Sequence, residues 1–394
     1  MVAVSEPYGL QPQARPIRVM LVDDSVVVRS LIGRWLSENG GFEVVAACRS
    51  ATIALAIFED AQPDVVLLDI EMPDLDGLAA LPRFLALGPH CAVVMLSSLA
   101  STQADIALRC VERGAADFIA KPGRTHEFVS SRDFEQALIQ KLTALGLQII
   151  ESGARRRPAT RSAPVPAPDP GAGATNVMRF PAAVPRPAVP PPPAIRPARR
   201  PGLIVVGAST GGPSAVLALL EAIKPVIRRL PVVVVQHMPA TFTPIFADHL
   251  TRQVGMDAHE IRDRELIVPG QVYIAPGGRH LQVAGQRGGI RAVLDDGPAI
   301  NFCKPSVDVL FHSAAQMLGS AVIGVVLTGM GTDGASGAGA IHAAGGAVFA
   351  QDEASSVVWG MPGTVYRTGI CQGIGTVPEL GRLVCQAVGV EPTS

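Results

Sequence analysis

Several common features are scarce or absent in this sequence, and each absence narrows the class of protein. No uninterrupted apolar run reaches the ~18 residues that a membrane span needs, and no apolar h-region of a signal peptide follows the N-terminus. Basic residues (33) do not exceed acidic residues (34), so the net charge of −1 gives no sign of nucleic-acid binding. We therefore expect a soluble cytoplasmic protein that neither enters a membrane nor binds nucleic acid.

Cysteine and aromatic residues are also few. The six cysteines are scattered and include no C-x-x-C pair, which is typical of reduced, mostly buried thiols in a cytoplasmic protein. Aromatic residues make up only 4%, yet the hydrophobic fraction of 48% is enough to build sizeable cores. With 394 residues, the chain is long enough for two or three domains.

Short apolar segments alternate with helical patterns in the first third of the chain. This alternation predicts an α/β domain with a parallel sheet covered on both faces. Its strands are expected at residues 17–22, 44–47, 65–68, 92–96 and 118–120.

Polar residues stand where these strands end. The carboxyl ends of parallel strands meet at one edge of a sheet, where open α/β sheets bind ligands. Three carboxylates gathered there repel one another unless a cation joins them, and hard oxygen ligands favour Mg²⁺. A single strand-end aspartate is most often a solvated charge. Five polar residues on four strand ends indicate a site instead, formed by Asp23, Asp24, Asp69, Ser97 and Lys121.

These residues, with the run Asp-Ile-Glu-Met-Pro-Asp-Leu-Asp-Gly at 69–77, resemble the receiver domains of response regulators. The resemblance implies a flavodoxin-like (βα)5 fold over residues 17–147, with Asp69 as the phosphorylated residue. It implies that the Mg²⁺ needed for phosphorylation is held by Asp23, Asp24, Asp69 and the backbone carbonyl of Glu71. It also implies a histidine kinase as phosphodonor, and a set of switch residues that comprises Ser97, Phe118 and Lys121.

Residues 148–201 differ in composition from what precedes and follows them. Proline, alanine and arginine dominate, and no apolar periodicity is present. Such a segment does not bury enough surface to fold, so we predict an extended or disordered linker. A second domain is predicted over residues 202–390.

The second domain opens on a glycine-rich turn, Gly-Ala-Ser-Thr-Gly-Gly at 207–212, between an apolar strand and a helical pattern. Free backbone N–H groups gather where a helix begins. A serine placed there, Ser209, can attack a carbonyl while neighbouring N–H groups hold the oxyanion. The turn also fits the G-x-S-x-G nucleophile pattern. Taken alone, such a turn more often only packs a strand against a helix.

Two further residues complete a candidate catalytic triad. His237 follows an apolar strand at 232–235, and Asp333 follows another at 321–327. If these strands share one parallel sheet with the serine turn, all three residues fall at strand-to-helix turns. The imidazole then acts as general base and the carboxylate orients it. The chain order Ser-His-Asp differs from the Ser-Asp-His order of ordinary α/β-hydrolases.

Two other functions fit parts of the sequence. Gly329, Gly331 and Gly334 match G-x-G-x-x-G, which favours a nicotinamide-dependent oxidoreductase. The carboxylate of Asp333 lies within that motif and would repel a dinucleotide's pyrophosphate. The second alternative is a non-catalytic scaffold in which a receiver is joined to a receptor-binding domain.

Motifs spread over residues 203–394 closely resemble the catalytic domain of the chemotaxis receptor methylesterases. They include the serine turn, Gln-His-Met-Pro at 236–239, Pro-Ser-Val-Asp at 305–308 and Leu-Thr-Gly-Met-Gly-Thr-Asp-Gly at 327–334. The resemblance implies a doubly wound, mainly parallel α/β domain with Ser209, His237 and Asp333 as the triad. It assigns the Met330 N–H to the oxyanion hole, to which we add the Thr210 N–H because it lies at a helix start.

This resemblance also implies the reaction and its partners. The domain would hydrolyse glutamyl methyl esters of methyl-accepting chemoreceptors, and deamidate receptor glutamines, with no cofactor for the hydrolysis. Phosphorylation of the receiver would activate it. One departure is Cys303-Lys304, where the family often has a His-Arg pair. Arginine and lysine differ in carboxylate geometry.

Overall fold

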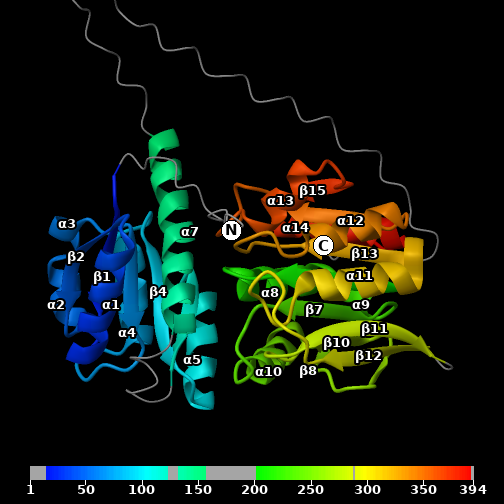
Figure 1. The fold of residues 1–394 in the computed structure, drawn as a ribbon, viewed down its shortest axis with the longest axis horizontal. Helices are drawn as coiled ribbons and strands as arrows, with labels where there is room; N and C mark the ends of the chain where they lie inside the picture. Colours follow the sequence, from blue (N-terminus) through cyan, green and yellow to red (C-terminus); the bar gives the residue numbers. More distant parts are fainter. Residues whose placement is uncertain (1–14, 123–131, 157–200, 287–288, 392–394) are drawn as a thin grey trace, which may run out of the picture.

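The computed structural model describes residues 15–122, 132–156, 201–286 and 289–391, which form two α/β units (Figure 1). The N-terminal unit comprises β1 to α7, and the C-terminal unit comprises β6 to α14. Each unit is built on its own main sheet, and α5 and α7 lie between the two sheets (Figure 1). In the ranges given above, no helix combines the length and the apolar character that a membrane span requires.

The N-terminal unit has a five-stranded sheet in the order β2-β1-β3-β4-β5, with every pair parallel. The central strand β3 is buried throughout, as expected for a sheet covered on both faces. The predicted fold is therefore confirmed. The strands are β1 (Ile17–Val22), β2 (Phe42–Cys48), β3 (Val65–Asp69), β4 (Ala92–Ser98) and β5 (Asp117–Lys121). The helices are α1 (Val26–Asn39), α2 (Ala51–Ala56), α3 (Phe58–Ala61), α4 (Gly77–Leu87), α5 (Ser101–Glu112) and α7 (Arg132–Arg156).

The C-terminal unit has a seven-stranded parallel sheet in the order β15-β14-β13-β6-β7-β10-β8. The first strand of the unit, β6, lies between β7 and β13, so the strand order reverses there. Such a switch point leaves a crevice at the carboxyl ends of the strands. The strands are β6 (Leu203–Ala208), β7 (Val232–Gln236), β8 (Asp257–Glu260), β10 (Gln271–Ile274), β13 (Val322–Val326), β14 (Ala347–Gln351) and β15 (Gly373–Gly375).

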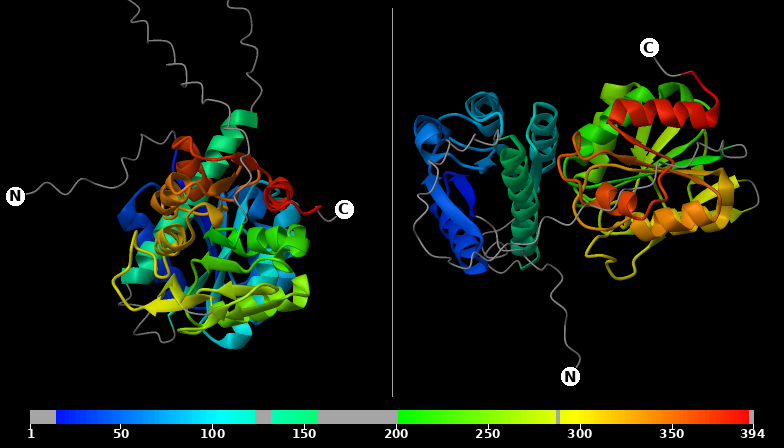
Figure 2. Two further views of the ribbon diagram at one scale, coloured as in Figure 1. Left: turned by 90° about the vertical axis from the view of Figure 1, so that its right-hand side faces the viewer. Right: turned by 90° about the horizontal axis from the view of Figure 1, so that it is seen from above.

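Helices cover both faces of this sheet, which confirms the predicted doubly wound architecture (Figure 2). A small antiparallel sheet adds to it and consists of β9 (Leu266–Ile267), β11 (His280–Gln286) and β12 (Gly289–Asp295). The helices are α8 (Gly212–Ala222), α9 (Lys224–Ile227), α10 (Thr243–Val254), α11 (Val307–Leu318), η1 (Gly319–Ala321), α12 (Ala335–Ala343), α13 (Met361–Arg367) and α14 (Val377–Val388).

The two units contact each other through α5, α8 and α10. The ring of Phe118, at β5, stacks on Phe242 with centroids 4.6 Å apart. Glu112 accepts a hydrogen bond from His249 at 2.7 Å, so an ion-pairing group of α5 meets α10 directly. Apolar residues of both units belong to one continuous core cluster. The structure therefore docks the N-terminal unit on the C-terminal unit rather than leaving the two separate.

Candidate active site

The serine turn is held from several sides at the carboxyl end of β6. The Ser209 N–H donates to the carbonyl of Thr328 at 3.0 Å. The Ser209 carbonyl accepts from the side chain of Gln236 at 2.9 Å. Gly211 has φ +74°, a left-handed conformation that favours glycine, and α8 begins immediately after it. The glycine turn thus fixes the serine at the start of a helix, where sequence analysis predicts it.

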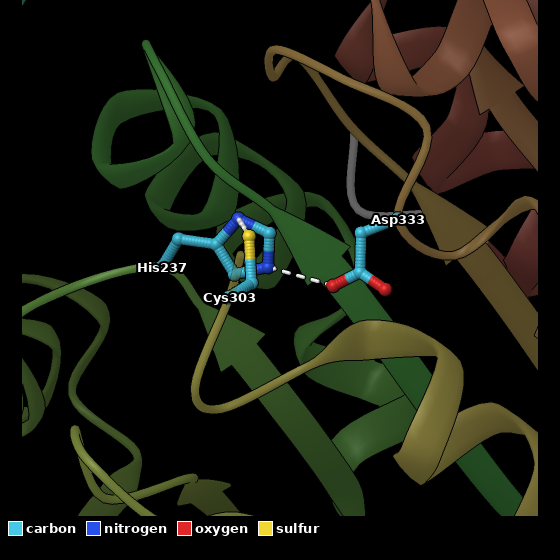
Figure 3. A group of neighbouring side chains, drawn as sticks. All are labelled: His237, Cys303 and Asp333. Carbon is cyan, nitrogen blue, oxygen red and sulfur yellow. Dashed lines mark hydrogen bonds and ion pairs between the residues drawn. The ribbon is translucent and has the colours of Figure 1, made fainter. Parts of the chain in front are cut away.

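His237 and Asp333 meet across the carboxyl ends of β7 and β13 (Figure 3). The imidazole Nε2 lies 2.9 Å from the carboxylate Oδ2. The Asp333 side chain is buried and also accepts the backbone N–H of Val307 at 2.7 Å and the hydroxyl of Ser306 at 2.8 Å. The carboxylate therefore lies at the N-terminus of α11, where the helix dipole favours negative charge.

Hydrogen bonding sets the protonation of this pair. Burial alone would raise the pKa of Asp333, but the bonds from His237, Val307 and Ser306 outweigh it and lower the pKa. Burial alone would lower the pKa of His237. The hydrogen bonds with Asp333 and Cys303 outweigh it, so the pKa of the imidazole is raised above its usual value of 6.5. The pair is thus built to stabilise an imidazolium beside a carboxylate.

The second ring nitrogen of His237 faces a thiol. Cys303 Sγ lies 3.4 Å from Nδ1, and the sulfur, a ring nitrogen of His237 and a carboxylate oxygen of Asp333 all lie within 4.8 Å of one another (Figure 3). Because Nε2 is engaged by the carboxylate, Nδ1 is the nitrogen left to take a proton from a nucleophile. Within the described part of the chain, the side chain of Ser209 forms no hydrogen bond with His237. The structure thus pairs His237, the predicted base, with the carboxylate predicted to orient it, while the thiol contacts the other ring nitrogen.

The residues predicted for the oxyanion hole flank the serine. Gly329 packs so closely on Ser209 that a Cβ on it would lie 2.8 Å from the serine Cβ, which brings the adjacent Met330 to the same place. Thr210 follows the serine directly. Among the described residues, neither the Met330 nor the Thr210 N–H donates to a protein group. Both donors are therefore available to a ligand.

Three residues that were not predicted as site residues position the pair. Ser306 donates to Asp333, as described above. Asn301 donates its side-chain N–H to Asp333 at 3.4 Å and to Asp308 at 3.1 Å. Cys303, noted only as a departure from a family pattern, contacts the imidazole. Ser306 immediately precedes α11, and its place in the Pro-Ser-Val-Asp motif at 305–308 was the signal in the sequence that pointed to it.

The predicted phosphorylation site is assembled at the carboxyl edge of the N-terminal sheet. The Nζ of Lys121 lies 2.7 Å from Asp69 and 3.3 Å from Asp23. Oxygens of Asp23, Asp24 and Asp69 lie within 4.8 Å of one another. Burial, together with the charge of Asp23, raises the pKa of Asp69 to about 6 against the opposing effect of Lys121. An all-oxygen donor set with such crowding of carboxylates fits Mg²⁺.

The remaining predicted switch residues lie beside this site. The Ser97 hydroxyl is buried and donates to the carbonyls of Ser98 at 3.1 Å and Gln103 at 3.3 Å. The side chain of Glu71 accepts from the side chain of Gln103. Phe118 is 4% exposed, because it is covered by Phe242 of the C-terminal unit. Phe118, the predicted aromatic switch residue, is therefore part of the contact between the two units.

Comparison with known proteins agrees with both units. Residues 204–384 match the CheB methylesterase family, and residues 19–131 match the response regulator receiver domain. A protein-glutamate methylesterase/protein-glutamine glutaminase of Nitrobacter hamburgensis is 46% identical over 97% of this chain and 98% of its own length. The chain belongs to the CheB methylesterase family.

Other relatives extend this comparison. The protein-glutamate methylesterase/protein-glutamine glutaminase of group 2 operon from Bradyrhizobium diazoefficiens is 45% identical over 95% of both chains. The crystal structure of the Thermotoga maritima CheB methylesterase catalytic domain is 36% identical, with a TM-score of 0.46, and covers 48% of this chain and 98% of its own.

Family membership gives no support to the dinucleotide-binding alternative, and neither does the loop itself. The space next to the Gly329 Cα is filled by the protein itself, since a Cβ at this position would lie 2.4 Å from the sulfur of Met361. The carboxylate of Asp333 takes up the N–H of Gly334 at 3.1 Å. The loop therefore directs its charge toward His237 rather than leaving N–H groups for a pyrophosphate.

Proposed function

We propose that this chain is a protein-glutamate methylesterase that also deamidates glutamines, acting on methyl-accepting chemoreceptors in the cytoplasm. The observation that carries the proposal is the His237–Asp333 pair, held at 2.9 Å beside the strand that bears Ser209. Relatives that are 45% and 46% identical carry the name of this activity. A binding scaffold would need neither an imidazole paired with a buried carboxylate nor two free N–H groups next to a serine.

The geometry supports acyl transfer through a serine ester. The Ser209 oxygen attacks the carbonyl carbon of the glutamyl methyl ester, and its proton passes to Nδ1 of His237. Asp333 stabilises the imidazolium, while the N–H groups of Met330 and Thr210 stabilise the oxyanion. The imidazolium returns the proton to the departing methanol. Water then hydrolyses the acyl-enzyme to glutamate by the same proton path, and a glutamine substrate releases ammonia instead of methanol.

Cys303 affects one step of this sequence. Its thiol lies against Nδ1, the nitrogen that must receive the serine proton. The Ser209 hydroxyl therefore has to replace the thiol at Nδ1 when substrate binds. This competition does not exist in relatives that lack a thiol at this position.

The direct test is methanol release. Purified full-length protein is incubated with a methylated cytoplasmic fragment of a chemoreceptor, and methanol is measured with and without acetyl phosphate and Mg²⁺. We expect methanol in proportion to the glutamate formed, and faster release with the phosphodonor. Stable binding of the receptor without methanol release would instead favour the scaffold alternative.

Regulation is proposed to work through the N-terminal unit, predicted over residues 17–147, and the catalytic domain, predicted over 202–390. The extended linker predicted from residue 148 is wrong for its first part, because α7 continues as a helix to Arg156. Residues 157–200 of that linker lie outside the described residues. A histidine kinase would phosphorylate Asp69. Mg²⁺, held by Asp23, Asp24, Asp69 and the carbonyl of Glu71, would balance the charge of the incoming phosphoryl group. Lys121 would exchange its bond with the carboxylate for one with the phosphoryl group, and Ser97 would turn toward it.

The contacts between the units give this signal a route. Phe118 stacks on Phe242, and the α7 side chain of Gln148 donates to the carbonyl of Ser356 at 2.8 Å. Met330 packs against a cluster made mainly of residues from the N-terminal unit. The residue proposed for the oxyanion hole thus packs on the apolar cluster in which residues of the N-terminal unit meet Val358. Phosphorylation would shift the population from this docked arrangement to one in which the crevice is open.

Weakening the docked arrangement is expected to raise basal activity. Glu112→Ala removes the ion pair with His249 between the units and should speed unphosphorylated hydrolysis about two- to fivefold, the range of a partly exposed pair. Glu43→Ala, which removes the pair with Arg18 inside the N-terminal unit, is the matched control. Equal basal rates in Glu112→Ala and the wild type would contradict the docking model of regulation.

The pH profile should report the raised pKa of His237. The base works only when neutral, so kcat/KM should rise with pH along a limb whose midpoint lies above 6.5. Because the Cys303 hydrogen bond contributes to the raised pKa, Cys303→Ala should move this limb to lower pH. The measurement is hydrolysis of a small glutamyl methyl ester from pH 5 to 10. An unchanged limb in the variant would show that the thiol does not bond to the imidazole in solution.

A further inference from the structure

The turn at residues 300–303 carries the most exposed large apolar side chain described in the structure. Phe302 is 80% exposed and Ile300 is 40% exposed. The turn is closed by two backbone hydrogen bonds. The N–H of Ile300 donates to the carbonyl of Cys303 at 3.1 Å, and the N–H of Cys303 donates to the carbonyl of Ile300 at 2.8 Å. An aromatic ring held in solvent by a closed turn gains no free energy of burial, and here two exposed apolar side chains stand on one short turn.

The backbone of this turn is strained where the ring is attached. Phe302 has φ +62° and Asn301 has φ +51°. Asparagine adopts this left-handed conformation readily, because its short polar side chain bonds locally, whereas phenylalanine does so rarely. A bulky residue held in this region without burial indicates that the ring is retained for contact with something outside the chain.

The neighbours of Phe302 place the ring at the rim of the active site. On one side, Asn301 donates to Asp333 at 3.4 Å, and on the other, the Cys303 thiol lies 3.4 Å from His237. Lys304 anchors the turn on its far side by donating to the carbonyl of Asp296 at 2.8 Å. Phe302 thus projects to solvent from a segment that contacts two members of the proposed triad. In the docked arrangement, the N-terminal unit leaves the ring uncovered.

We propose that Phe302, supported by Ile300, positions the substrate by packing on the apolar face of the receptor helix that carries the esterified glutamate. This rests on the proposed function. An ester that reaches Ser209 extends from its helix by one glutamyl side chain, so the helix must cross the rim next to the reacting groups. The exposed ring is continuous with the site and offers apolar contact area that an amphipathic helix can cover.

The test compares a protein substrate with a small one. Phe302→Asn removes the ring and suits the left-handed backbone, so the fold is expected to be kept and the melting temperature to stay equal or rise. We expect kcat/KM for the methylated receptor fragment to fall at least about tenfold, the size of effect that a single aromatic contact at an interface gives. Hydrolysis of a small glutamyl methyl ester should be unchanged, and Phe302→Leu should restore most of the activity on the receptor.

Two controls separate the outcomes. Leu87→Asn replaces an apolar side chain that is 41% exposed on the N-terminal unit and should leave both substrates unaffected. The second control measures the affinity of the methylated receptor fragment for the Ser209→Ala variant, with and without Phe302→Asn. It tests the contact between Phe302 and the receptor even if the wild type hydrolyses neither substrate and the proposed function fails. We expect the affinity to weaken about tenfold. Unchanged affinity, or an equal loss of hydrolysis on both substrates, would overturn the proposal.

Discussion

Ser209→Ala is expected to lower methyl-ester hydrolysis on the order of 10⁴-fold or more, since losing the nucleophile of a serine triad removes covalent catalysis. The loss should appear in kcat, for the receptor fragment and for the small ester alike. The backbone of the turn should persist, because its hydrogen bonds with Thr328 and Gln236 use main-chain atoms of the serine. Affinity for the receptor should therefore change little.

The matched control is Ser320→Ala. Ser320 lies in η1, just before β13, and hence at the amino edge of the same sheet, opposite the crevice. The Ser320→Ala variant should hydrolyse both substrates at the wild-type rate. Trapping of a radiolabelled acyl-enzyme on the wild type, and its absence in Ser209→Ala, would identify the covalent intermediate directly. A Ser209→Ala variant that retains more than about a tenth of wild-type kcat would exclude the triad, because residual catalysis without a nucleophile is far smaller than that.

Asp333→Asn is expected to reduce kcat about 10⁴-fold, the loss seen when an amide replaces the aspartate of such a triad. The carboxylate accepts from His237 and stabilises the imidazolium that forms in the reaction. An amide is neutral and stabilises that charge less. The pKa of His237 should therefore fall, and the residual activity should show an ascending pH limb below that of the wild type.

Asp308→Asn is a demanding control for this variant. Asp308 is also a buried carboxylate at the start of α11, and it accepts from the Gly337 N–H at 2.7 Å without contacting His237. Its loss should cost stability comparable to that of Asp333→Asn and far less activity. Similar activities in the two variants would mean that Asp333 only holds α11 in place.

The sequence alone determined which residues are available for chemistry in each unit. Asp69 and Ser209 could be proposed as site residues because buried strands have apolar sequences, and polar residues then mark where each strand ends. In a parallel sheet these ends meet on one edge, so residues far apart in the chain are brought together by topology. For the same reason, the doubly wound fold of both units followed from the alternation of strand and helix patterns.

Only the tertiary structure decided how those residues are arranged. The order β13-β6-β7, which puts Ser209 between the other two candidates, depends on pairing between distant strands. The Nε2 of His237 contacts Asp333, and its Nδ1 contacts Cys303. This arrangement depends on the conformation of the turn at 300–303. Stacking of Phe118 on Phe242 depends on the docking of one unit on the other. Hydrophobic periodicity records which side chains are buried within an element, but it holds no information about the side chains they meet across a loop or an interface.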